Sequence, residues 1–377
     1  MRNRAVHQYL SLLPLEGRGS TMLPLLILLA TALVVQPITV DEYKKLPVEK
    51  DFKDMTGQEA VDYINSHQTF YKAAYKPGIE EFVQSRLMKS KYLDDPLADK
   101  LMPRIEPVGD DPLPESFDPR DKWTKCAKII GHIRDQSNCG SCWAVANTEV
   151  MSDRVCIQTD AKYTVHISDT DLLACCGSYC GYGCEGGYTA RGWTYFTSSG
   201  ICTGGPYGDK NCCKPYAFYP CGKHENQTYY GPCPWNTWDT PACRNQCQLK
   251  YRKREYEDDK FWGNGSYYVA ANETAIRREI YNNGPVLVSF RVYSDFSYYK
   301  GGVYIQKSGY DQGGHAVKMV GWGVDKTGAS PIPYWLVANS WNVDWGENGF
   351  FRIIRGTNEC NIEGNVIGGR VNLKKLP

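Results

Sequence analysis

The sequence predicts an α+β fold built from two unlike subdomains, a helical one followed by a β-rich one. Residues 143–160 contain no Gly or Pro, and their apolar side chains recur at the spacing of one helical face. From Tyr267 onwards the chain instead holds short β-branched and aromatic runs bounded by Gly, Pro or Asn, which are typical of strands. Helices followed by antiparallel strands indicate an α+β arrangement, and a ligand is expected in the cleft between two such halves.

Cys142 lies at the start of the predicted helix, within residues 136–143. Unpaired backbone N–H groups and the helix dipole favour an anion at a helix N-terminus, so this thiol is expected to ionise more readily than a free cysteine. The thiolate is the nucleophilic form, and the segment is therefore predicted to present a reactive cysteine. Strands are expected later, at residues 286–292, 316–320 and 334–337.

The composition indicates an oxidising compartment. The chain has 377 residues, enough for one large domain or two ordinary ones, and its net charge of +1 gives no reason to expect nucleic acid as a partner. None of the sixteen cysteines precedes Cys126, and fifteen fall between Cys126 and Cys247. Such a density indicates disulfides, which form in the secretory pathway.

Residues 1–39 are predicted to be a secretory leader, with Met22 as a second candidate start. Residues 22–35 are almost entirely apolar, which is short for a membrane span and the right length for the core of a signal peptide. A transmembrane anchor is the alternative. Sequons at Asn226, Asn264 and Asn272 predict N-glycosylation and agree with export, although each three-residue pattern alone is weak evidence.

Residues 40–111 are predicted to be a propeptide, with an ordinary small N-terminal domain as the alternative. The segment is rich in charge and proline and has no cysteine, and residues 58–75 have the spacing of one amphipathic helix. The composition changes at Asp-Asp-Pro-Leu-Pro, residues 110–114. The body, residues 112–377, is expected to divide into a helical subdomain, about 124–258, and a β subdomain, about 259–377.

The cysteine-rich middle of the chain is predicted to be held by disulfides. The spacing of Cys175, Cys176, Cys180 and Cys184 also resembles that of a zinc site, but disulfides dominate in exported chains. No metal and no cofactor are therefore expected. Residues 204–238 show little periodicity, and a loop of that length flanked by cysteines is expected to be functional.

A cysteine nucleophile needs a base, a group that orients the base, and donors for the oxyanion. His315 is the candidate base, because two glycines before it allow close backbone approach at the start of a strand. Asn339 could accept the proton of the other ring nitrogen and fix the tautomer. The remaining histidines are His7 in the leader, His67 in the propeptide, His132 and His166 beside apolar residues, and His224 in the long loop.

Several motifs together carry a family resemblance. They are Cys-Gly-Ser-Cys-Trp at 139–143, Asp-Pro-Arg at 118–120, Asp-Leu-Leu-Ala-Cys-Cys-Gly at 171–177, Cys-Glu-Gly-Gly-Tyr at 184–188, Tyr-Ser-Asp-Phe at 293–296, Gly-Trp-Gly at 321–323 and Asn-Ser-Trp-Asn at 339–342. The chain resembles the papain family of cysteine peptidases, and within it the cathepsin B branch, over essentially residues 113–369. The resemblance implies a papain-like fold with the active-site cleft between its two subdomains.

By that resemblance Cys142 is the nucleophile, His315 is its ion-pair partner and later general acid, and Asn339 orients the imidazole. Gln136 and the backbone N–H of Cys142 form the oxyanion hole. Trp341 shields the hydrogen bond between Asn339 and His315 from water. The substrate-binding residues that the resemblance implies are Gly186, Gly187, Tyr188, Lys223, His224, Ala316, Trp341 and Asn365.

His315 follows Cys142 at a longer distance than the roughly 130–150 residues usual for the family, so an insertion is required. The loop around Cys221 and Cys233 supplies it. In the cathepsin B branch this loop blocks the primed end of the cleft, and a pair of histidines captures the C-terminal carboxylate of a substrate.

The loop departs from that branch in two ways. It has one histidine, His224, preceded by Lys223, and the arginine that helps to latch the loop is missing. Asp344 is therefore expected to lack its partner, which leaves the contact of His224 with Asp135 as the latch. A looser loop, dominant endopeptidase activity and reduced or altered dipeptidyl carboxypeptidase activity are expected, unless Lys223 itself holds the carboxylate.

Asn365 marks a second departure. The branch member that accepts arginine at P2 has a glutamate at the matching position of the S2 pocket. An amide cannot replace a carboxylate in an ion pair with a guanidinium, so an apolar or aromatic P2 residue is expected.

The resemblance also implies the disulfides. Six pairs carry over by position, Cys202 and Cys212 are additional and would most simply pair with each other, and Cys360 is left free. The seven expected pairs are Cys126–Cys156, Cys139–Cys184, Cys175–Cys243, Cys176–Cys180, Cys202–Cys212, Cys213–Cys247 and Cys221–Cys233.

Two other functions are weighed against a peptidase. Cys139 and Cys142 form a C-x-x-C pattern, which also occurs in thiol–disulfide oxidoreductases, and an inactive disulfide-rich binding protein is the second alternative. For a peptidase the partners implied are polypeptide substrates, its own propeptide and cystatin-type inhibitors, acting on a monomer in a lysosome or outside the cell. Residues 334–347 and 223–228 resemble gut peptidases of blood-feeding worms, which implies digestion of host protein.

Overall fold

The computed structural model describes residues 38–47, 54–307, 309–328 and 330–377. The chain divides into two units, residues 1–34 and 35–377, and the described residues all belong to the second. The predicted leader core at 22–35 and the second start at Met22 lie outside the described residues. Among the helices that are described, none is long and apolar enough to cross a membrane.

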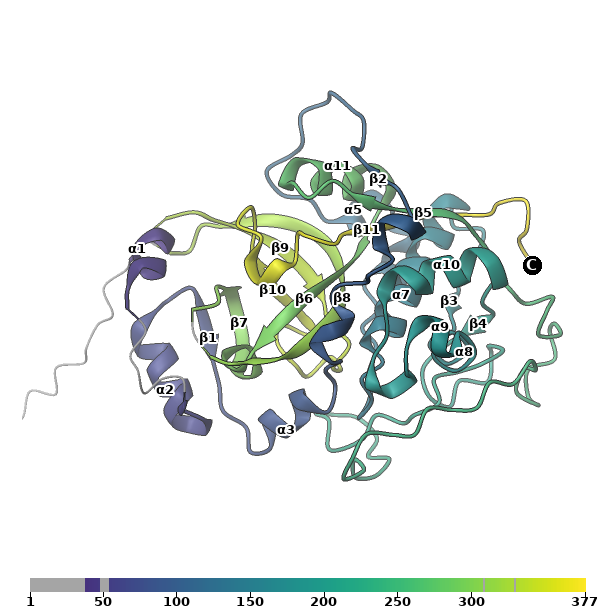
Figure 1. Cartoon of the computed structure of the whole chain (residues 1–377), viewed down its shortest axis with the longest axis horizontal. Coiled ribbons are helices and arrows are strands. Elements are labelled where there is room, and N and C mark those ends of the chain that lie inside the picture. The colour runs from purple at the N-terminus through teal and green to yellow at the C-terminus, as the bar shows by residue number, and fades with distance from the viewer. Residues whose placement is uncertain (1–37, 48–53, 308, 329) are drawn as a thin grey trace, which may run out of the picture. The chain divides into compact units, whose positions relative to one another are not determined.

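The helices lie mainly in residues 40–111, the predicted propeptide, and in the first half of the residues that follow (Figure 1). They are α1 (Val40–Lys45), α2 (Gly57–His67), α3 (Ile79–Gln84), α4 (Ala98–Leu101), α5 (Pro119–Lys122), α6 (Ala127–Ile130), α7 (Cys142–Gln158), α8 (Asp169–Cys175), α9 (Gly177–Cys180), α10 (Thr189–Ser199) and α11 (Glu273–Asn283), with 3₁₀ turns at Ser90–Tyr92, Thr124–Cys126, Gly183–Glu185, Ser294–Tyr298 and Glu359–Asn361.

The strands form one large mixed sheet and one two-stranded sheet. The large sheet has the order β1-β7-β10-β9-β8-β6-β11-β5-β2, and β3 pairs with β4. Their bounds are β1 (Tyr71–Ala73), β2 (Arg104–Ile105), β3 (His166–Ile167), β4 (Thr203–Gly204), β5 (Gly263–Val269), β6 (Val286–Tyr293), β7 (Tyr299–Tyr304), β8 (Asp311–Asp325), β9 (Ile332–Ala338), β10 (Phe350–Ile354) and β11 (Ile367–Val371).

This arrangement confirms the α+β class. Strands β6 to β10 gather on one side of Figure 1, and helices α7 to α10 on the other. Helix α7 is buried along nearly its whole length, and its apolar side chains pack in one cluster with residues of α8, α10 and the sheet. The predicted helix at 143–160 thus exists and begins at Cys142. Residues 205–262, all of which the structure describes, contain no helix or strand, as expected for the long loop region.

The propeptide helix is shorter than the sequence predicts. Helix α2 ends at His67, because the side chain of Gln68 accepts from the N–H groups of Phe70 and Tyr71 and donates to the carbonyl of Tyr71. These bonds turn the chain into β1, which pairs antiparallel with β7. Tertiary pairing therefore overrides the helical spacing beyond residue 67.

The predicted propeptide supplies the strand at each edge of the large sheet. Strand β1 pairs with β7 at one edge, and β2 pairs parallel with β5 at the other. An unpaired sheet edge exposes backbone donors and acceptors, so β1 and β2 protect the outer edges of β7 and β5.

The structure forms six of the seven expected disulfides. They are Cys126–Cys156, Cys139–Cys184, Cys175–Cys243, Cys176–Cys180, Cys213–Cys247 and Cys221–Cys233. All cysteines lie in the described part of the chain, and four of them, including the expected free Cys142 and Cys360, are unpaired. Because Cys139 is bonded to Cys184, Cys139 and Cys142 are not a redox pair.

The expected Cys202–Cys212 pair is wrong. The sulfur of Cys202 points into the interior, within 4.8 Å of a carboxylate oxygen of Asp259 and of the Cys213 sulfur. The sulfur of Cys212 instead faces the backbone oxygen of Asp209 at 3.9 Å. The two sulfurs therefore have different neighbours, and simple elimination from sequence could not show this.

Candidate active site

The thiol of Cys142 sits at the first residue of α7 and is fully buried. Burial raises its pKa to about 12, although the backbone N–H groups of Ala316, Trp143 and Met88 and of Cys142 itself all lie close enough to lower it. Neutral thiol is therefore the form in this state of the protein. The N–H groups of Ala316, Trp143 and Cys142 are those expected to stabilise a thiolate once the covering residues, Met88 among them, leave.

His315 lies on β8, next to Ala316, whose N–H faces the thiol. Its Nε2 donates to Oδ1 of Asn339 at 2.7 Å, and its ring stacks on Trp341 with centroids 4.7 Å apart. Among the described residues, Nδ1 of His315 has no hydrogen-bond partner. Burial lowers the pKa of His315 to about 4, against the opposing effect of the bond to Asn339. The imidazole is thus a neutral base held in one orientation.

Gln136 is buried behind the cysteine. Its Nε2 donates to the carbonyl of Cys139 at 2.7 Å and to that of Arg86 at 2.8 Å, and its Oε1 accepts from Ser340 at 2.7 Å. The amide is thereby fixed with its donor side toward the propeptide. The resemblance implies that Nε2 of Gln136 donates to the oxyanion. In this structure that group donates to the carbonyl oxygen of Arg86 instead.

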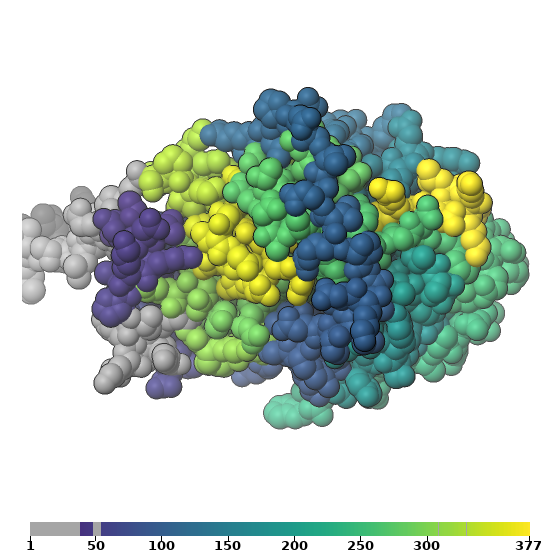
Figure 2. All heavy atoms as spheres, turned by 45° about the horizontal axis from the view of Figure 1, so that its top comes forward, coloured from purple at the N-terminus to yellow at the C-terminus, as the bar shows by residue number. Residues whose placement is uncertain are grey.

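The propeptide runs through the cleft between the two subdomains. Met88 pairs antiparallel with Gly314, through N–H to O distances of 3.0 and 2.8 Å. In Figure 2 the dark-blue propeptide residues lie along the boundary between the yellow and green β half and the teal helical half. A side chain at Gly186 would collide with Tyr92 and Met88, since an added Cβ would lie 2.6 and 2.8 Å from their atoms.

The cleft beyond Gly186 is filled by the next propeptide residues. Nδ2 of Asn365 donates to the carbonyl of Leu93 at 3.4 Å, in a pocket of about 210 Å³ that Thr189 and Tyr268 also line. Leu93 belongs to the same apolar cluster as Ala316. Tyr188, another expected substrate residue, packs edge-on against Tyr92 with ring centroids 5.0 Å apart.

The loop closed by Cys221–Cys233 is latched by His224. Its Nδ1 lies 2.9 Å from Asp344 and its Nε2 lies 3.3 Å from Asp135. Burial opposes the charged imidazolium, but the hydrogen bond to Asp344 and the charge of Asp135 outweigh it and raise the pKa of His224. His224 therefore binds both carboxylates.

The expectation that Asp344 lacks a partner is wrong. One imidazole has two nitrogens, and here it bridges the two aspartates, while the N–H of Glu225 also donates to Asp344 at 3.3 Å. Gln227 adds a contact, because its Nε2 donates to Asn342 at 2.6 Å. These contacts hold the loop in place, and they do not support the expectation of a looser loop. Lys223 is exposed beside them.

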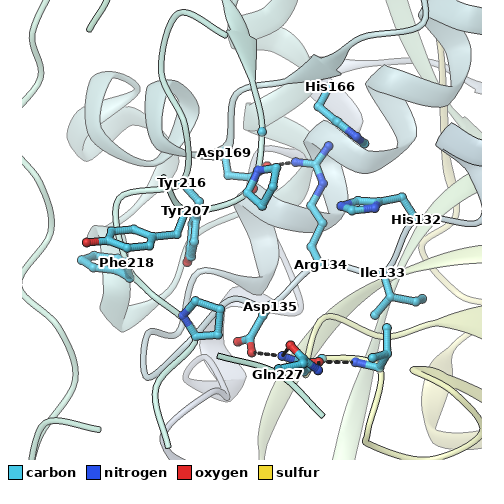
Figure 3. A pocket seen from close by; sticks show the side chains of 15 residues that line it. His132, Ile133, Arg134, Asp135, His166, Asp169, Tyr207, Tyr216, Phe218 and Gln227 are labelled. Carbon is cyan, nitrogen blue, oxygen red and sulfur yellow. Dashed lines mark hydrogen bonds and ion pairs between the residues drawn. The ribbon is translucent and has the colours of Figure 1, made fainter. Parts of the chain in front are cut away.

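A cavity of about 170 Å³ lies behind this latch (Figure 3). Asp135 and Gln227 lie at one end of it and the rings of His132 and His166 at the other, with centroids 4.5 Å apart. Burial is the main cause that lowers the pKa of His132 to about 4 and that of His166 to about 2. Both rings are neutral and separate from the cleft residues around Cys142, as expected for structural histidines.

The three sequon asparagines, Asn226, Asn264 and Asn272, are exposed. Asn272 also caps α11, since its Oδ1 accepts from the N–H of Ala275 at 2.8 Å. A glycan on its Nδ2 would leave that bond intact. The positions therefore suit the predicted modification.

Sequence reasoning missed the propeptide side of the site, namely Arg86, Leu87, Met88, Tyr92 and Leu93. These residues carry no reactive group and lie outside the motifs. The only signal is two short apolar pairs, Leu87-Met88 and Tyr92-Leu93, among basic and serine residues after α3. Their function lies in their shape and backbone.

Comparisons with known proteins agree with this geometry. Residues 113–369 match the family model described as "Papain family cysteine protease". The chain is 42% identical over 343 residues to Cathepsin B-like cysteine proteinase 6 of Caenorhabditis elegans, covering 89% of each chain. It is 43% identical over 338 residues to Cathepsin B-like cysteine proteinase 1 of Haemonchus contortus, covering 89% of this chain and 95% of the relative.

Among solved structures, proCathepsin B S9 from Trypanosoma congolense is similar with a TM-score of 0.70 and 35% identity, over 85% of this chain and 99% of that one. Digestive procathepsin L 3 of Tenebrio molitor larval midgut, at 20% identity and a TM-score of 0.59 over 87% and 95%, shares the fold alone.

Proposed function

We propose, because this chain belongs to the papain family of cysteine proteases, that it hydrolyses polypeptides with Cys142 as nucleophile and His315 as its proton partner. The observation that carries the proposal is the placement of the Cys142 thiol at a helix start, ringed by backbone N–H groups, beside a histidine that Asn339 orients. These are the parts that a nucleophilic cysteine needs.

In the reaction the Cys142 proton passes to Nδ1 of His315, and the thiolate attacks the scissile carbonyl carbon. The oxyanion accepts from Nε2 of Gln136 and from the backbone N–H of Cys142. The tetrahedral species collapses when His315 gives its proton to the leaving amine, which forms a thioester. Water, with its proton taken by His315, then hydrolyses the thioester and frees the carboxylate product.

Residues 40–111 act as an inhibitory propeptide on a body of residues 112–377. Support comes from two backbone contacts across the cleft. Met88 pairs with Gly314, and the carbonyl of Arg86 accepts from the side chain of Gln136. Burial under this segment keeps the thiol neutral. The chain is thus made as an inactive zymogen, with its leader within residues 1–39, and travels through the secretory pathway to a lysosome or out of the cell.

The substrate site is proposed to prefer an apolar or aromatic P2 residue. The zymogen places Leu93 beside Asn365, and the amide brings no charge for an arginine. Gly186 and Gly187 bind the substrate backbone, and Trp341 covers the Asn339–His315 bond.

Endopeptidase activity is proposed to dominate. Lys223 and His224 stand where the branch has two histidines, so capture of a C-terminal carboxylate is reduced or altered. The mature enzyme is proposed to be a monomer that cystatin-type inhibitors bind and that serves digestion, including digestion in a gut lumen.

The test is acidic activation of the zymogen, N-terminal sequencing, and hydrolysis of one peptide with a free or an amidated C-terminus. Similar rates for both termini, loss of activity in Cys142→Ser, and a new N-terminus near residue 112 are expected. A strong preference for the free acid would contradict the endopeptidase proposal. Activity that persists in Cys142→Ser would contradict the nucleophile.

A further inference from the structure

The first described helix of the propeptide, α1, packs on the β subdomain at a place remote from Cys142 in the fold. Tyr43 is buried there and meets Phe70 edge-on, with ring centroids 5.3 Å apart. Figure 2 shows this purple segment against light-green and yellow residues of the body. The patch under it is apolar and comes from three strands or their ends: Val303, Ile305, Ile332 and Ile354.

Lys307 of the body caps the C-terminus of α1. Its Nζ donates to the backbone carbonyls of Tyr43, Lys44 and Leu46, at 2.5, 2.9 and 2.5 Å. The last carbonyls of a helix have no partner within it and carry its negative dipole end, so an ammonium group is well matched to them. One cation thus satisfies three backbone acceptors of the propeptide.

A second charged contact lies beside the first. Nζ of Lys44 is 2.6 Å from Glu359, whose side chain is 6% exposed. Glu359 is fixed in advance by the N–H of Gln306 at 2.8 Å and the hydroxyl of Thr357 at 3.2 Å. A preset, nearly buried carboxylate favours one lysine in one position over exposed alternatives.

Helix α1 is itself prepared for this contact. Thr39 and Glu42 form a reciprocal capping box, in which the Thr39 side chain accepts from the Glu42 N–H and the Glu42 carboxylate accepts from the Thr39 N–H. Such a box defines where a short helix begins. The box, the buried Tyr43 and the terminal carbonyls together make a compact binding element within residues 38–46.

We propose that this patch, centred on Lys307, Glu359 and Ile305, is an anchoring site outside the cleft that binds residues 38–46 and retains the propeptide after the chain is cut. The proposal rests on the inhibitory role of the propeptide proposed above. The connection between propeptide and body runs through exposed residues, and Val108 is 87% exposed, so a peptidase reaches it first.

Retention follows because the blocking segment lies on the same chain as attachments outside the cleft, namely the anchor and strands β1 and β2, which pair with β7 and β5. Residues 86–93 block the cleft and residues 38–46 hold the anchor, so release of the blocking segment alone leaves it tethered at a high effective concentration. The anchor strengthens this tether, so the cut zymogen stays inhibited for longer while the anchor is closed. The ligand class that the site takes is a short helical peptide with an aromatic residue and free C-terminal carbonyls.

The experiment uses the full chain with a recognition sequence for a specific protease inserted between Val108 and Gly109. The folded zymogen is cut at neutral pH and diluted, and recovery of activity on a short fluorogenic peptide gives the release rate. Size-exclusion chromatography follows the same release without reference to activity. The variants are Lys307→Met, which keeps the aliphatic stem, and Tyr43→Ala.

The matched control is Lys326→Met, because Lys326 is an exposed lysine of the same subdomain that contacts Glu115 at 2.8 Å. Both anchor variants are expected to release the propeptide at least tenfold faster, while the control releases it at the wild-type rate. The released enzymes should share one kcat/KM. Wild-type release rates in both anchor variants would overturn the anchoring site.

If the chain is not a peptidase, the same experiment gives a different result. In that case chromatography still reports release, but the freed body shows no peptidase activity and no reaction of Cys142 with an epoxide inhibitor. Should Tyr43→Ala give no folded zymogen, Lys307→Met decides the question alone, since its side chain lies at the surface of the body and the substitution leaves the apolar patch intact.

Discussion

Nε2 of Gln136 donates to the backbone carbonyl of Arg86 at 2.8 Å, so the propeptide occupies a donor of the active site. Substituting Gln136→Ala removes that donor from catalysis. We expect kcat of the activated enzyme to fall by about 10²- to 10³-fold with little change in KM, as for loss of one oxyanion donor. Steady-state kinetics on a fluorogenic peptide measures this. An unchanged kcat would show that the oxyanion lies elsewhere.

The second prediction concerns the effect of Arg86 on zymogen stability. Its Nε and Nη2 are buried without hydrogen-bond partners among the described residues. Burial lowers its pKa to about 10, although Asp135, Tyr216 and Asp344 favour the charge. Arg86→Met should therefore stabilise the zymogen by on the order of 1–4 kcal/mol and slow its acid activation.

Thermal unfolding of the zymogen and the lag before activity measure these effects. Lys89→Met is the control, since Lys89 pairs with Glu185 at the exposed surface and such pairs contribute little. A less stable Arg86→Met zymogen would mean that attraction to the two aspartates outweighs burial.

The His224 latch predicts a pH dependence. The latched state raises the pKa of His224, so the imidazolium bridge is complete at acid pH and is lost as the pH rises through that raised value, above the ordinary 6.5. Asp344, whose pKa is lowered despite burial by its bond to His224, keeps its charge until below 3.8. The latch should therefore hold in weak acid and open in weak base.

Endopeptidase cleavage of a long, amidated peptide should rise relative to release of C-terminal dipeptides as the pH passes from 5 to 8. His224→Ala should remove most of that change, because both carboxylates lose their shared partner at every pH. A ratio that is flat with pH in the wild-type enzyme would contradict the latch.

Asn365 predicts the specificity of the S2 pocket. Wild-type enzyme should cleave a substrate with phenylalanine at P2 faster than one with arginine, and Asn365→Glu should raise kcat/KM for P2 arginine by tenfold or more, since a charged pair replaces an amide contact. A fluorogenic panel measures both. Equal use of arginine by the wild-type enzyme would refute the assignment.

Much of the cleft could be predicted because its chemistry requires particular residue types in motifs. The α+β class and α7 followed from the change of periodicity, and the structure brings His315 and Asn339 together as the resemblance implied. The directions of side chains could not be predicted. The sulfurs of Cys202 and Cys212 have different neighbours and do not pair, and Asp344 has a partner because one imidazole bridges two carboxylates.

The propeptide was less predictable, since it works through backbone and shape. Helix α1 was not expected. Thr39 and Glu42 have the spacing of a capping box, and this signal could have predicted the six-residue helix. Helix α2 ended early for a local reason, the Gln68 side chain, that periodicity does not contain.

The central claim is that Cys142 is a nucleophile kept neutral and covered by the propeptide. The most direct measurement is alkylation by an epoxide cysteine-peptidase inhibitor at pH 5.5, with the labelled residue identified by mass spectrometry before and after activation. We predict no label in the intact zymogen and one label per molecule, on Cys142, in the activated enzyme. Equal labelling in both states, or a label absent from Cys142 after activation, would contradict the claim.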